Sequence, residues 1–387
     1  MDNKQHLRLI IGGFLSLAVV MGIGRFAYTP LLPYMEEATG LSSFSSGLLA
    51  TWNYIGYFLG ALLAGRATFR VRWFYIFLFV SAMTTYSMGV TESMLIWSAL
   101  RLLSGVASGF VFVFMSEWII RRLAEDGGAK GVGLLYSGVG FGILFTGIVL
   151  PLILPLTTWQ MGWVFLGVVS IGLIVGIYQS TKHVTPTSLP TRTISVGKKQ
   201  PLLSINVLLI SYFLEGFGYI IYATFITSVL ATVASFSFDV VWIWAIVGMG
   251  AMPSCFFWAW LGRVLKKETA LILAYLIQVV SLILPTGSTN ALLVFLSAFG
   301  FGATFMGITV LTIALAKEQQ TMKPVVSQLT AAYAIGQLLG PVVAGMLLMI
   351  HGETVAFVVS AGAVALALVF LCLSYMKRGQ QHAVRQY

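Results

Sequence analysis

Charged side chains are scarce in this sequence. Asp, Glu, Lys and Arg together make up 9% of its 387 residues, whereas soluble domains carry roughly 25%. Hydrophobic residues make up 58%, and the mean hydropathy is +0.94. A chain of this length has no core large enough to hide so much apolar surface from water. We therefore expect lipid to surround most of the chain, and an all-α polytopic membrane protein as its fold class.

Residues that hold metals, form disulfides or bind nucleotides are also rare. Cys255 and Cys372 both lie in apolar segments without a metal-ligand spacing, and we interpret them as packing residues. No His, Cys and carboxylate cluster has metal-ligand spacing. The string "VGKK" near Val196 lacks the upstream glycine of a phosphate loop. We therefore expect no metal, no cofactor and no ATP hydrolysis. An embedded enzyme would need a catalytic cluster near one interface, and since none is visible we predict that the protein is not an enzyme.

Long apolar runs, in contrast, fill the sequence. Windows of about 20 apolar residues predict twelve membrane spans. They run roughly over residues 8–34, 43–65, 72–90, 93–120, 130–153, 159–180, 202–231, 238–262, 269–287, 290–316, 324–350 and 354–376. The N-terminus is basic and then apolar, as in a signal peptide, but its apolar run is too long and has no cleavage site, so we expect a retained first helix.

One polar, basic and proline-bearing segment interrupts the series of spans. It covers residues 182–201 and is predicted to be a cytoplasmic linker. The linker divides the chain into an N-terminal six-helix bundle, residues 1–181, and a C-terminal six-helix bundle, residues 202–387. The predicted architecture is therefore two bundles of six transmembrane helices each.

The charges are distributed unevenly between the two sides of the predicted membrane. Twenty of the 22 Lys and Arg residues fall on one side. The opposite loops hold only acidic residues, which are Glu36, Glu37, Glu92, Asp239 and Glu353. Because basic loops stay in the cytoplasm, this bias predicts a multi-pass protein of the inner membrane with both termini cytoplasmic. It also accounts for the net charge of +10, so no nucleic-acid partner is needed.

The two halves repeat internally. The string "GIGRFAYTP" from Gly22 aligns with "GFGYIIYAT" from Gly216 at an offset of 194 residues. The strings "GRATFR" and "GRVLKK" align at 197, and Gly105 aligns with Gly300 at 195. Three matches at nearly one offset indicate a duplicated six-helix unit. Two parallel repeats with pseudo-symmetry often hold a transport site at their interface.

Twelve spans, a basic central linker and a basic turn after the second span resemble the major facilitator superfamily. The strings "GIGRFAYTPLLP" and "GQLLGPVVAG" are similar to its YbfB/YjiJ-type branch. The resemblance implies two bundles that alternate access to a cavity lined by the first, fourth, seventh and tenth spans. One departure is Gly65, which stands where the superfamily usually has an aspartate before Arg66.

Four ionisable residues fall within the predicted spans: Arg25, Arg101, Glu117 and Glu215. An arginine at membrane depth costs about 2.5–3.5 kcal/mol on insertion scales, so such residues usually face the protein interior or a wet cavity. The resemblance implies that Arg25, Arg101 and Glu215 project into one chamber. Arg101 opens "RLLSGVASG", which resembles the superfamily's fourth-helix arginine motif, linked there to proton coupling. We therefore assign Arg101 and Glu215 to proton coupling.

Each embedded charge also has a structural alternative. Either arginine could clamp helix carbonyls or a glycine-broken turn. Glu215 could form a permanent ion pair with Arg25 that holds the halves together. Glu117 lies just before "WIIRR", and the resemblance suggests that it closes the inner face by pairing with Arg66 or Arg70.

Uncharged residues complete the candidate site. Helical spacing places Tyr219 and Tyr222 on one face with Glu215. The full set of predicted substrate-binding residues is Arg25, Tyr28, Asn53, Tyr57, Arg101, Tyr219, Tyr222, Tyr333 and Gln337. Buried amides need partners in lipid, and a neighbouring backbone would serve as well as a ligand. The predicted gating residues are Arg66, Arg70, Glu117, Gly336, Gly340 and Pro341.

The charge balance of the predicted cavity indicates the kind of substrate. Two arginines against one glutamate leave a positive surplus, which favours a small organic anion with an apolar or aromatic body. We therefore predict a proton-coupled secondary transporter that moves such an anion by alternating access. The alternative is a proton-driven efflux antiporter for drugs or hydrophobic metabolites. The predicted partners are a small-molecule substrate, the proton and the lipid bilayer, and we expect a monomer. Duplicated halves with lone embedded charges argue against a channel.

Overall fold

The computed structural model describes residues 3–66, 71–123, 129–184, 203–232, 239–286, 290–318 and 325–384. Within these ranges the chain is almost entirely helical, as the sequence predicts. The elements of the first half are α1 (Asn3–Leu17), the π-helix η1 (Ala18–Ile23), α2 (Tyr28–Thr39), α3 (Ser43–Arg66), α4 (Val71–Met88), α5 (Met94–Leu123), α6 (Ala129–Ile153), the short 3₁₀ helix η2 (Leu154–Leu156) and α7 (Trp159–Thr181). Those of the second half are α8 (Ile205–Ala231), α9 (Trp242–Val264), α10 (Lys267–Ile283), α11 (Ala291–Glu318), α12 (Val325–His351) and α13 (Glu353–Val384).

Helices occupy all twelve predicted spans within the described residues. Ten of the spans are long and apolar enough to cross a membrane, and the first of them combines α1, η1 and α2. The other two spans are α4 and α10, with 18 and 17 residues. The protein is therefore a multi-pass, all-α membrane protein.

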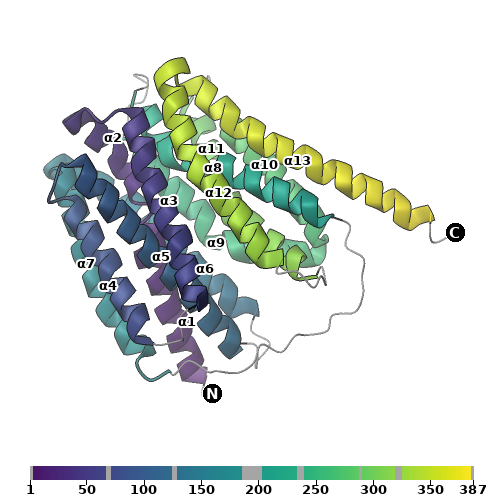
Figure 1. Ribbon diagram of the computed structural model, residues 1–387, viewed down its shortest axis with the longest axis horizontal. Helices are drawn as coiled ribbons and strands as arrows, with labels where there is room; N and C mark the ends of the chain where they lie inside the picture. Colours follow the sequence, from purple (N-terminus) through teal and green to yellow (C-terminus); the bar gives the residue numbers. More distant parts are fainter. Residues whose placement is uncertain are drawn as a thin grey trace.

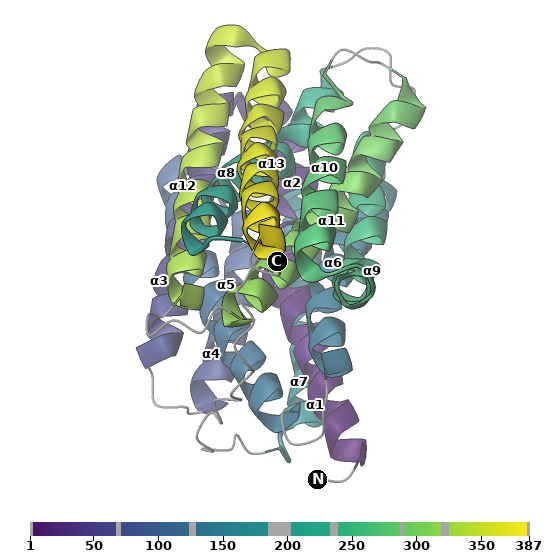
Figure 2. The same ribbon diagram turned by 90° about the vertical axis from the view of Figure 1, so that its right-hand side faces the viewer.

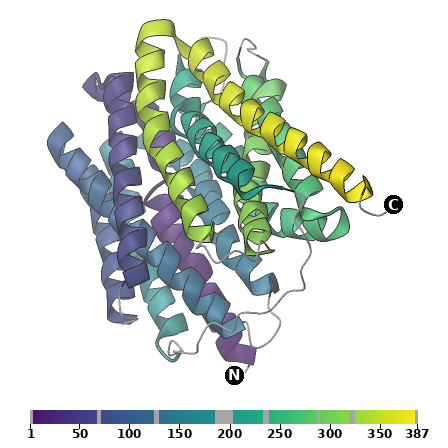
Figure 3. The same cartoon turned by 45° about the vertical axis from the view of Figure 1, so that its right-hand side comes forward.

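The helices form two groups, α1–α7 and α8–α13, which appear as the purple-to-blue and the green-to-yellow parts of Figure 1. The groups meet along three helix pairs: α3 with α12, α6 with α9, and α2 with α8. Figures 1 and 3 both show α3 beside α12, and Figure 2 shows α6 beside α9. Most of the predicted linker lies outside the described residues, so its boundaries stay a prediction.

The alternating direction of consecutive helices gives the molecule two chemically different ends. We call one the basic end, because the described basic residues Arg8, Arg72, Arg122, Lys182, Arg263, Lys267, Lys317 and Lys377 lie at helix termini there. We call the other the acidic end, because Glu36, Glu37, Glu92, Asp239 and Glu353 lie at the opposite helix termini. The charge asymmetry of the sequence therefore becomes a difference between two faces of the bundle.

The first span is broken in its middle, where the sequence predicts one continuous helix. The backbone first widens into a π-helix and then leaves regular helix before α2 begins. Pro30 explains the break, because it has no N–H to bond the carbonyl of Phe26 and its ring crowds that carbonyl. Gly22 lets this segment pack closely against α6, since a Cβ there would lie 2.4 Å from the Cα of Gly142. The break leaves carbonyl oxygens in the membrane interior that other residues must satisfy.

The corresponding span of the second half is not broken. Helix α8 runs for 27 residues without interruption, although its "GFGYIIYAT" string aligns with the broken segment. It has no proline where the first half has Pro30. The pseudo-symmetric halves therefore differ in conformation at the aligned site.

Candidate functional site

Arg25 follows the π-helix and lies at the break in the first span. Its side chain is only 3% exposed. The guanidinium carbon lies 4.3 Å from the ring centre of Tyr54, 4.4 Å from that of Tyr57 and 5.4 Å from that of Phe26. Nη1 contacts the sulfur of Met21 at 3.9 Å, whereas Nε and Nη2 have no hydrogen-bond partner within the described residues. Ring faces attract the cation, but the unpaired N–H groups remain open to an anionic acceptor.

Arg101 makes different contacts from Arg25. Its terminal nitrogens lie 3.4–3.5 Å from the carbonyl oxygens of Gly24 and Arg25, and Ser104 donates a hydrogen bond to the Gly24 carbonyl at 3.2 Å. The Arg101 guanidinium also lies over the ring of Tyr28 at 4.6 Å. These contacts satisfy the carbonyls that the broken helix exposes. These contacts are the ones expected if Arg101 clamps helix carbonyls, which was the structural alternative to a role in proton coupling.

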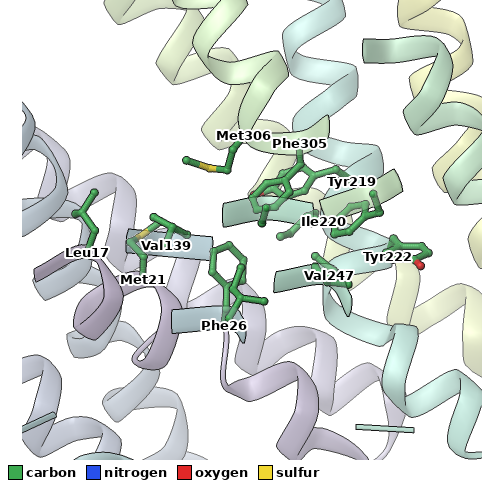
Figure 4. Packing of buried hydrophobic residues seen from close by; sticks show 14 of the residues in the cluster. Leu17, Met21, Phe26, Val139, Tyr219, Ile220, Tyr222, Val247, Phe305 and Met306 are labelled. Atoms are coloured by element: carbon green, nitrogen blue, oxygen red, sulfur yellow. The ribbon is translucent and has the colours of Figure 1, made fainter. Parts of the chain in front are cut away.

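A wall of stacked aromatic rings faces Arg25 from the other bundle. The ring of Tyr219 on α8 lies nearly parallel to those of Tyr333 (5.5 Å, 9°) and Phe305 (5.9 Å, 6°). Gln337 on α12 donates a hydrogen bond to the Tyr219 hydroxyl, and Tyr219 lies within electrostatic range of Arg25. Figure 4 shows Phe26 facing Tyr219 and Phe305, and the edge of the Phe26 ring meets the Phe305 ring at 6.2 Å where the bundles touch. Tyr219, Tyr333 and Gln337 therefore lie where the sequence predicts a cavity.

Glu215 does not share this chamber. It is 0% exposed, and within the described residues its carboxyl accepts one hydrogen bond, from Gln278 Nε2 on α10 at 2.8 Å. Its Oε2 and the Oε1 of Gln278 are both buried without a partner. The expectation that Arg25, Arg101 and Glu215 meet in one chamber is therefore wrong. Glu215 lies inside the C-terminal bundle, and the contacts found for it do not include an ion pair with Arg25.

Three more predicted substrate ligands are engaged within their own bundles. Tyr222 exchanges a hydrogen bond with Ser297 at 2.7 Å, and in Figure 4 its hydroxyl points away from Tyr219. Tyr28 donates to the carbonyl of Ser46 at 2.9 Å. Asn53 donates to the carbonyl of Arg101 at 3.0 Å. The two tyrosine hydroxyls and the Asn53 Nδ2 therefore have structural partners, whereas the Oδ1 of Asn53 is buried without one among the described residues.

The two bundles are joined by hydrogen bonds in the half that leads to the acidic end. Thr29 donates to the carbonyl of Ala223, and Thr227 donates back to the carbonyl of Thr29, each at 2.5 Å. Tyr34 donates to the carboxylate of Asp239 at 2.8 Å. These bonds hold the two bundles together toward the acidic end.

Glu36 joins the bundles at the same end. The sequence places it in a loop, but it lies in the last turns of α2 and is half-buried. One carboxylate oxygen accepts a hydrogen bond from Ser46 at 2.7 Å, and the other accepts one from Ser228 of the opposite bundle. A nearby cavity of about 660 Å³ is lined in part by Glu36, Glu37 and Asp239. Sequence reasoning missed this contact because it counted Glu36 only as a charge outside the spans.

The predicted gating residues divide into two groups. Gly336 and Gly340 let α12 approach α8, since a Cβ at either would lie 2.3 Å from an atom of that helix. Pro341 contacts the other bundle, because a Cβ at Gly47 of α3 would lie 2.2 Å from its carbonyl oxygen. Glu117 lies on α5, but Arg70 and the side chain of Arg66 fall outside the described residues, so the latch at the basic end stays a prediction.

Sequence reasoning also missed two aromatic residues of the site. Tyr54 lies three residues before Tyr57, so both share a helix face, and this spacing could have identified it. Phe305 carries no polar group, and nothing in the sequence separates it from the many core phenylalanines. Among the described residues, no group of three or more His, Cys, Asp or Glu side chains is arranged to hold a metal.

Solved structures with this fold are transporters. A crystal structure of a point mutant of the nucleoside transporter NupG superposes with a TM-score of 0.73 at 14% identity, covering 96% of this chain and 100% of NupG. A bacterial homologue of the human lysosomal transporter Spinster, in an inward-facing and occupied conformation, gives 0.64 at 14% identity, covering 98% and 97%. At these identities the likeness shows the fold. This chain therefore shares the fold of these two transporters.

Sequence relatives give a narrower assignment. The chain belongs to the family described as uncharacterised MFS-type transporter YbfB, whose model matches residues 17–372. The MFS-type transporter YcaD of Salmonella typhimurium is 21% identical over 392 residues, or 97% of each chain. YceJ of Bacillus subtilis is 25% identical over 209 residues, so the match spans about half of each protein.

Proposed function

We propose that this transporter moves a small organic anion with a flat aromatic body, and that the anion binds Arg25. The observation that carries the proposal is the buried Arg25 guanidinium, whose Nε and Nη2 have no hydrogen-bond partner among the described residues. Removing a cation from water costs several kcal/mol unless a counter-charge is present. A carboxylate could accept two parallel N–H bonds from the guanidinium fork, and such paired bonds between ionised groups are stronger than bonds between neutral ones.

The lining of the site supports an aromatic body for the anion. On one side lie Tyr54 and Tyr57, which already contact the guanidinium. On the other side lie the parallel rings of Tyr219, Tyr333 and Phe305. Offset stacking of a planar ligand on such rings adds about 0.5–1.5 kcal/mol per pair beyond the burial of area. Apolar walls with a few placed polar groups, here Arg25 and Gln337, are typical of small-molecule sites.

We further propose that the transport is coupled to protons through Glu215. A neutral carboxylic acid could donate from Oε2 to the Gln278 Oε1, which would satisfy both unpartnered atoms of the pair. An ionised carboxylate would leave them unpaired in the interior of the bundle. Glu215 lies one helical turn before Tyr219 on α8. Gain or loss of a proton at Glu215 would therefore act through this one helix on the stacked rings that include Tyr219. One proton moving down 100 mV supplies about 2.3 kcal/mol.

The basic end would face the cytoplasm of a cell with an inner membrane, because basic loops are retained there. Both termini would then be cytoplasmic, and the acidic end would face outward. The protein would work as a monomer. Import by symport and export by antiport would use the same site, and the direction of the proton-driven flux in oriented vesicles distinguishes them.

Substitution of Arg25 tests the anion site. We expect Arg25→Gln to weaken the binding of aromatic monocarboxylates about 10- to 100-fold, because a hydrogen bond to a charged group contributes about 1.5–3 kcal/mol. Binding is measured by calorimetry on the purified protein, with the corresponding aromatic amides as neutral probes. Arg8→Gln is the matched control, since Arg8 is an exposed arginine on α1. Equal affinity of Arg25→Gln and the native protein across the panel would refute the anion site.

Substitution of Glu215 tests the coupling. We expect Glu215→Gln to keep exchange of labelled for unlabelled substrate but to lose accumulation driven by a proton gradient, because an amide cannot release a proton. Both activities are measured in vesicles containing the purified protein. Glu268→Gln, which removes a carboxyl from the first turn of α10, is the control. Gradient-driven accumulation that survives in Glu215→Gln rules the assignment out.

A further inference from the structure

A second cavity lies toward the basic end, between α6, α9 and α11. Its volume is about 310 Å³, which is at the lower limit of cavities that hold small organic ligands. Tyr136, Phe256 and Val310 contribute to its mostly apolar lining, and Arg263 and Lys267 contribute its basic groups. The cavity lies at the seam of the two bundles, because α6 belongs to one and α9 and α11 to the other.

A row of aromatic contacts connects this cavity with Arg25. The Arg25 guanidinium lies on the ring of Tyr57 at 4.4 Å. The ring of Tyr57 meets that of Phe112 at 6.1 Å, and Phe112 stacks on Tyr136 at 5.4 Å. All three rings are half-buried, so each keeps part of its surface open. Tyr136 then lines the cavity itself.

The cavity carries a net positive charge. Lys267 forms an ion pair with Glu318, which neutralises it locally. Arg263 uses Nε to bond the carbonyl of Ala259 at 3.3 Å. Within the described residues its two terminal nitrogens have no hydrogen-bond acceptor, and the side chain is exposed at the cavity. Arg263 can therefore bind an anionic group while the rings and aliphatic side chains contact an apolar body.

We propose that this cavity is a second binding station for the transported anion, which it occupies between Arg25 and the solution at the basic end. The inference rests on the proposed anion transport. The anionic group binds Arg263, and the aromatic body rests against Tyr136 and Val310. From there the anion passes along Phe112 and Tyr57 to the central arginine. The weaker, more exposed station raises the local concentration of substrate next to the buried site.

Arg263 has two alternative roles. Basic residues at this end set the orientation of the protein in the membrane, and an anionic lipid headgroup could bind to Arg263. The row of rings favours the transported anion, because a lipid headgroup needs no path to Arg25. The control Arg72→Gln removes an equally exposed arginine from the same end, on α4 and outside the cavity. It separates a local binding role from a general effect of charge.

The test is calorimetry and transport with aromatic monocarboxylates, on protein in bilayers of phosphatidylcholine alone. We expect the native protein to bind at two sites, Arg25→Gln to keep only the weaker one, and Arg263→Gln to keep only the tighter one. Arg263→Gln should raise KM for substrate offered at the basic end about 3- to 10-fold with little change in kcat, and Arg72→Gln should change neither. Ala259→Trp, which fills the cavity without removing charge, should reproduce the Arg263→Gln result.

The outcomes separate the two proposals. If no aromatic carboxylate binds at all, the proposed function fails. If one site is found, and Arg263→Gln and Ala259→Trp both transport as the native protein does, the second station is refuted while the central site stands. If Arg263→Gln has an effect only when phosphatidylglycerol is added to the bilayer, the cavity is a lipid site and the inference is overturned.

Discussion

At the scale of single residues, the main feature is Arg25, a buried cation for which no anionic partner is found among the described residues. Its guanidinium is buried, and among the described residues its contacts are with neutral groups, the rings of Tyr54 and Tyr57 and the sulfur of Met21, without a counter-charge. Rings stabilise a desolvated cation by about 2 kcal/mol each, but they do not replace the hydrogen bonds that Nε and Nη2 make to water in the unfolded chain. The remaining deficit is what an anionic substrate would offset on binding.

The contribution of the ring of Tyr54 can be measured directly. We expect Tyr54→Leu to lower the free energy of unfolding by about 2 kcal/mol and Tyr54→Phe by much less, since phenylalanine keeps the ring face. In an Arg25→Met background the cost of Tyr54→Leu should shrink, because the cation is gone. The free energies are measured by thermal unfolding of the native protein, Tyr54→Leu, Arg25→Met and the double variant, which together form a double-mutant cycle. Equal costs in both backgrounds would show that Tyr54 contributes packing alone.

At the scale of elements, the broken first span decides where Arg25 lies. The break brings the carbonyls of Gly24 and Arg25 within reach of Arg101 and Ser104 on α5. These two residues therefore position the segment that carries Arg25. The sequence allowed both this role and a coupling role for Arg101, and the observed contacts favour the positioning role.

Loss of this support should destabilise the protein. We expect Arg101→Gln and Ser104→Ala each to lower the free energy of unfolding by about 1–3 kcal/mol, because each leaves buried carbonyls less well satisfied. The proton-to-substrate ratio of residual transport should not change. Ser98→Ala is the control, since Ser98 bonds only a carbonyl of its own helix among the described contacts. An unchanged melting temperature together with a lost proton dependence would contradict the positioning role.

At the scale of the whole molecule, the described hydrogen bonds between the bundles concentrate toward the acidic end. Thr29 takes part in two of them, Thr227 and Tyr34 each take part in one, and Glu36 bonds a serine from each bundle. An alternating-access transporter must break such bonds to open this end. Glu36 is the member whose removal would leave hydroxyls of both bundles without their acceptor.

Glu36 should therefore control the closure of the acidic end. We expect Glu36→Ala to shift the spin-label distance between Val90→Cys and Leu292→Cys toward longer values, in a chain whose two native cysteines are replaced. Both label sites are exposed and belong to different bundles. Glu37→Ala should leave the distance distribution as it was, because Glu37 is the exposed neighbour. A distribution that both variants leave unchanged would show that Glu36 does not hold this end closed.

The sequence predicted Arg25, Tyr57, Tyr219 and Gln337 as site residues because polar groups in apolar helices are few and seldom face lipid. In the structure Arg25 contacts Tyr57, and Gln337 contacts Tyr219. It placed Glu215 wrongly for a geometric reason. Depth along a helix follows from residue number, but the direction of a side chain around the axis does not. Glu215 faces Gln278 inside its own bundle, as Tyr222, two turns later, faces Ser297, whereas Tyr219 faces the other bundle.

The amino-acid sequence alone determined that the protein lives in lipid, the number of its spans, the division into two halves and the identity of its embedded charges. Each of these follows from composition and from the cost of burying polar groups in hydrocarbon. The tertiary structure decided the partners of three of these charges: rings for Arg25, the carbonyls of a broken helix for Arg101 and an amide for Glu215. In a membrane both the packed and the lipid-facing sides of a helix are apolar, so no stripe of polarity fixes its rotation. Only close contacts with neighbouring helices, such as Gly22 against Gly142, settle that rotation.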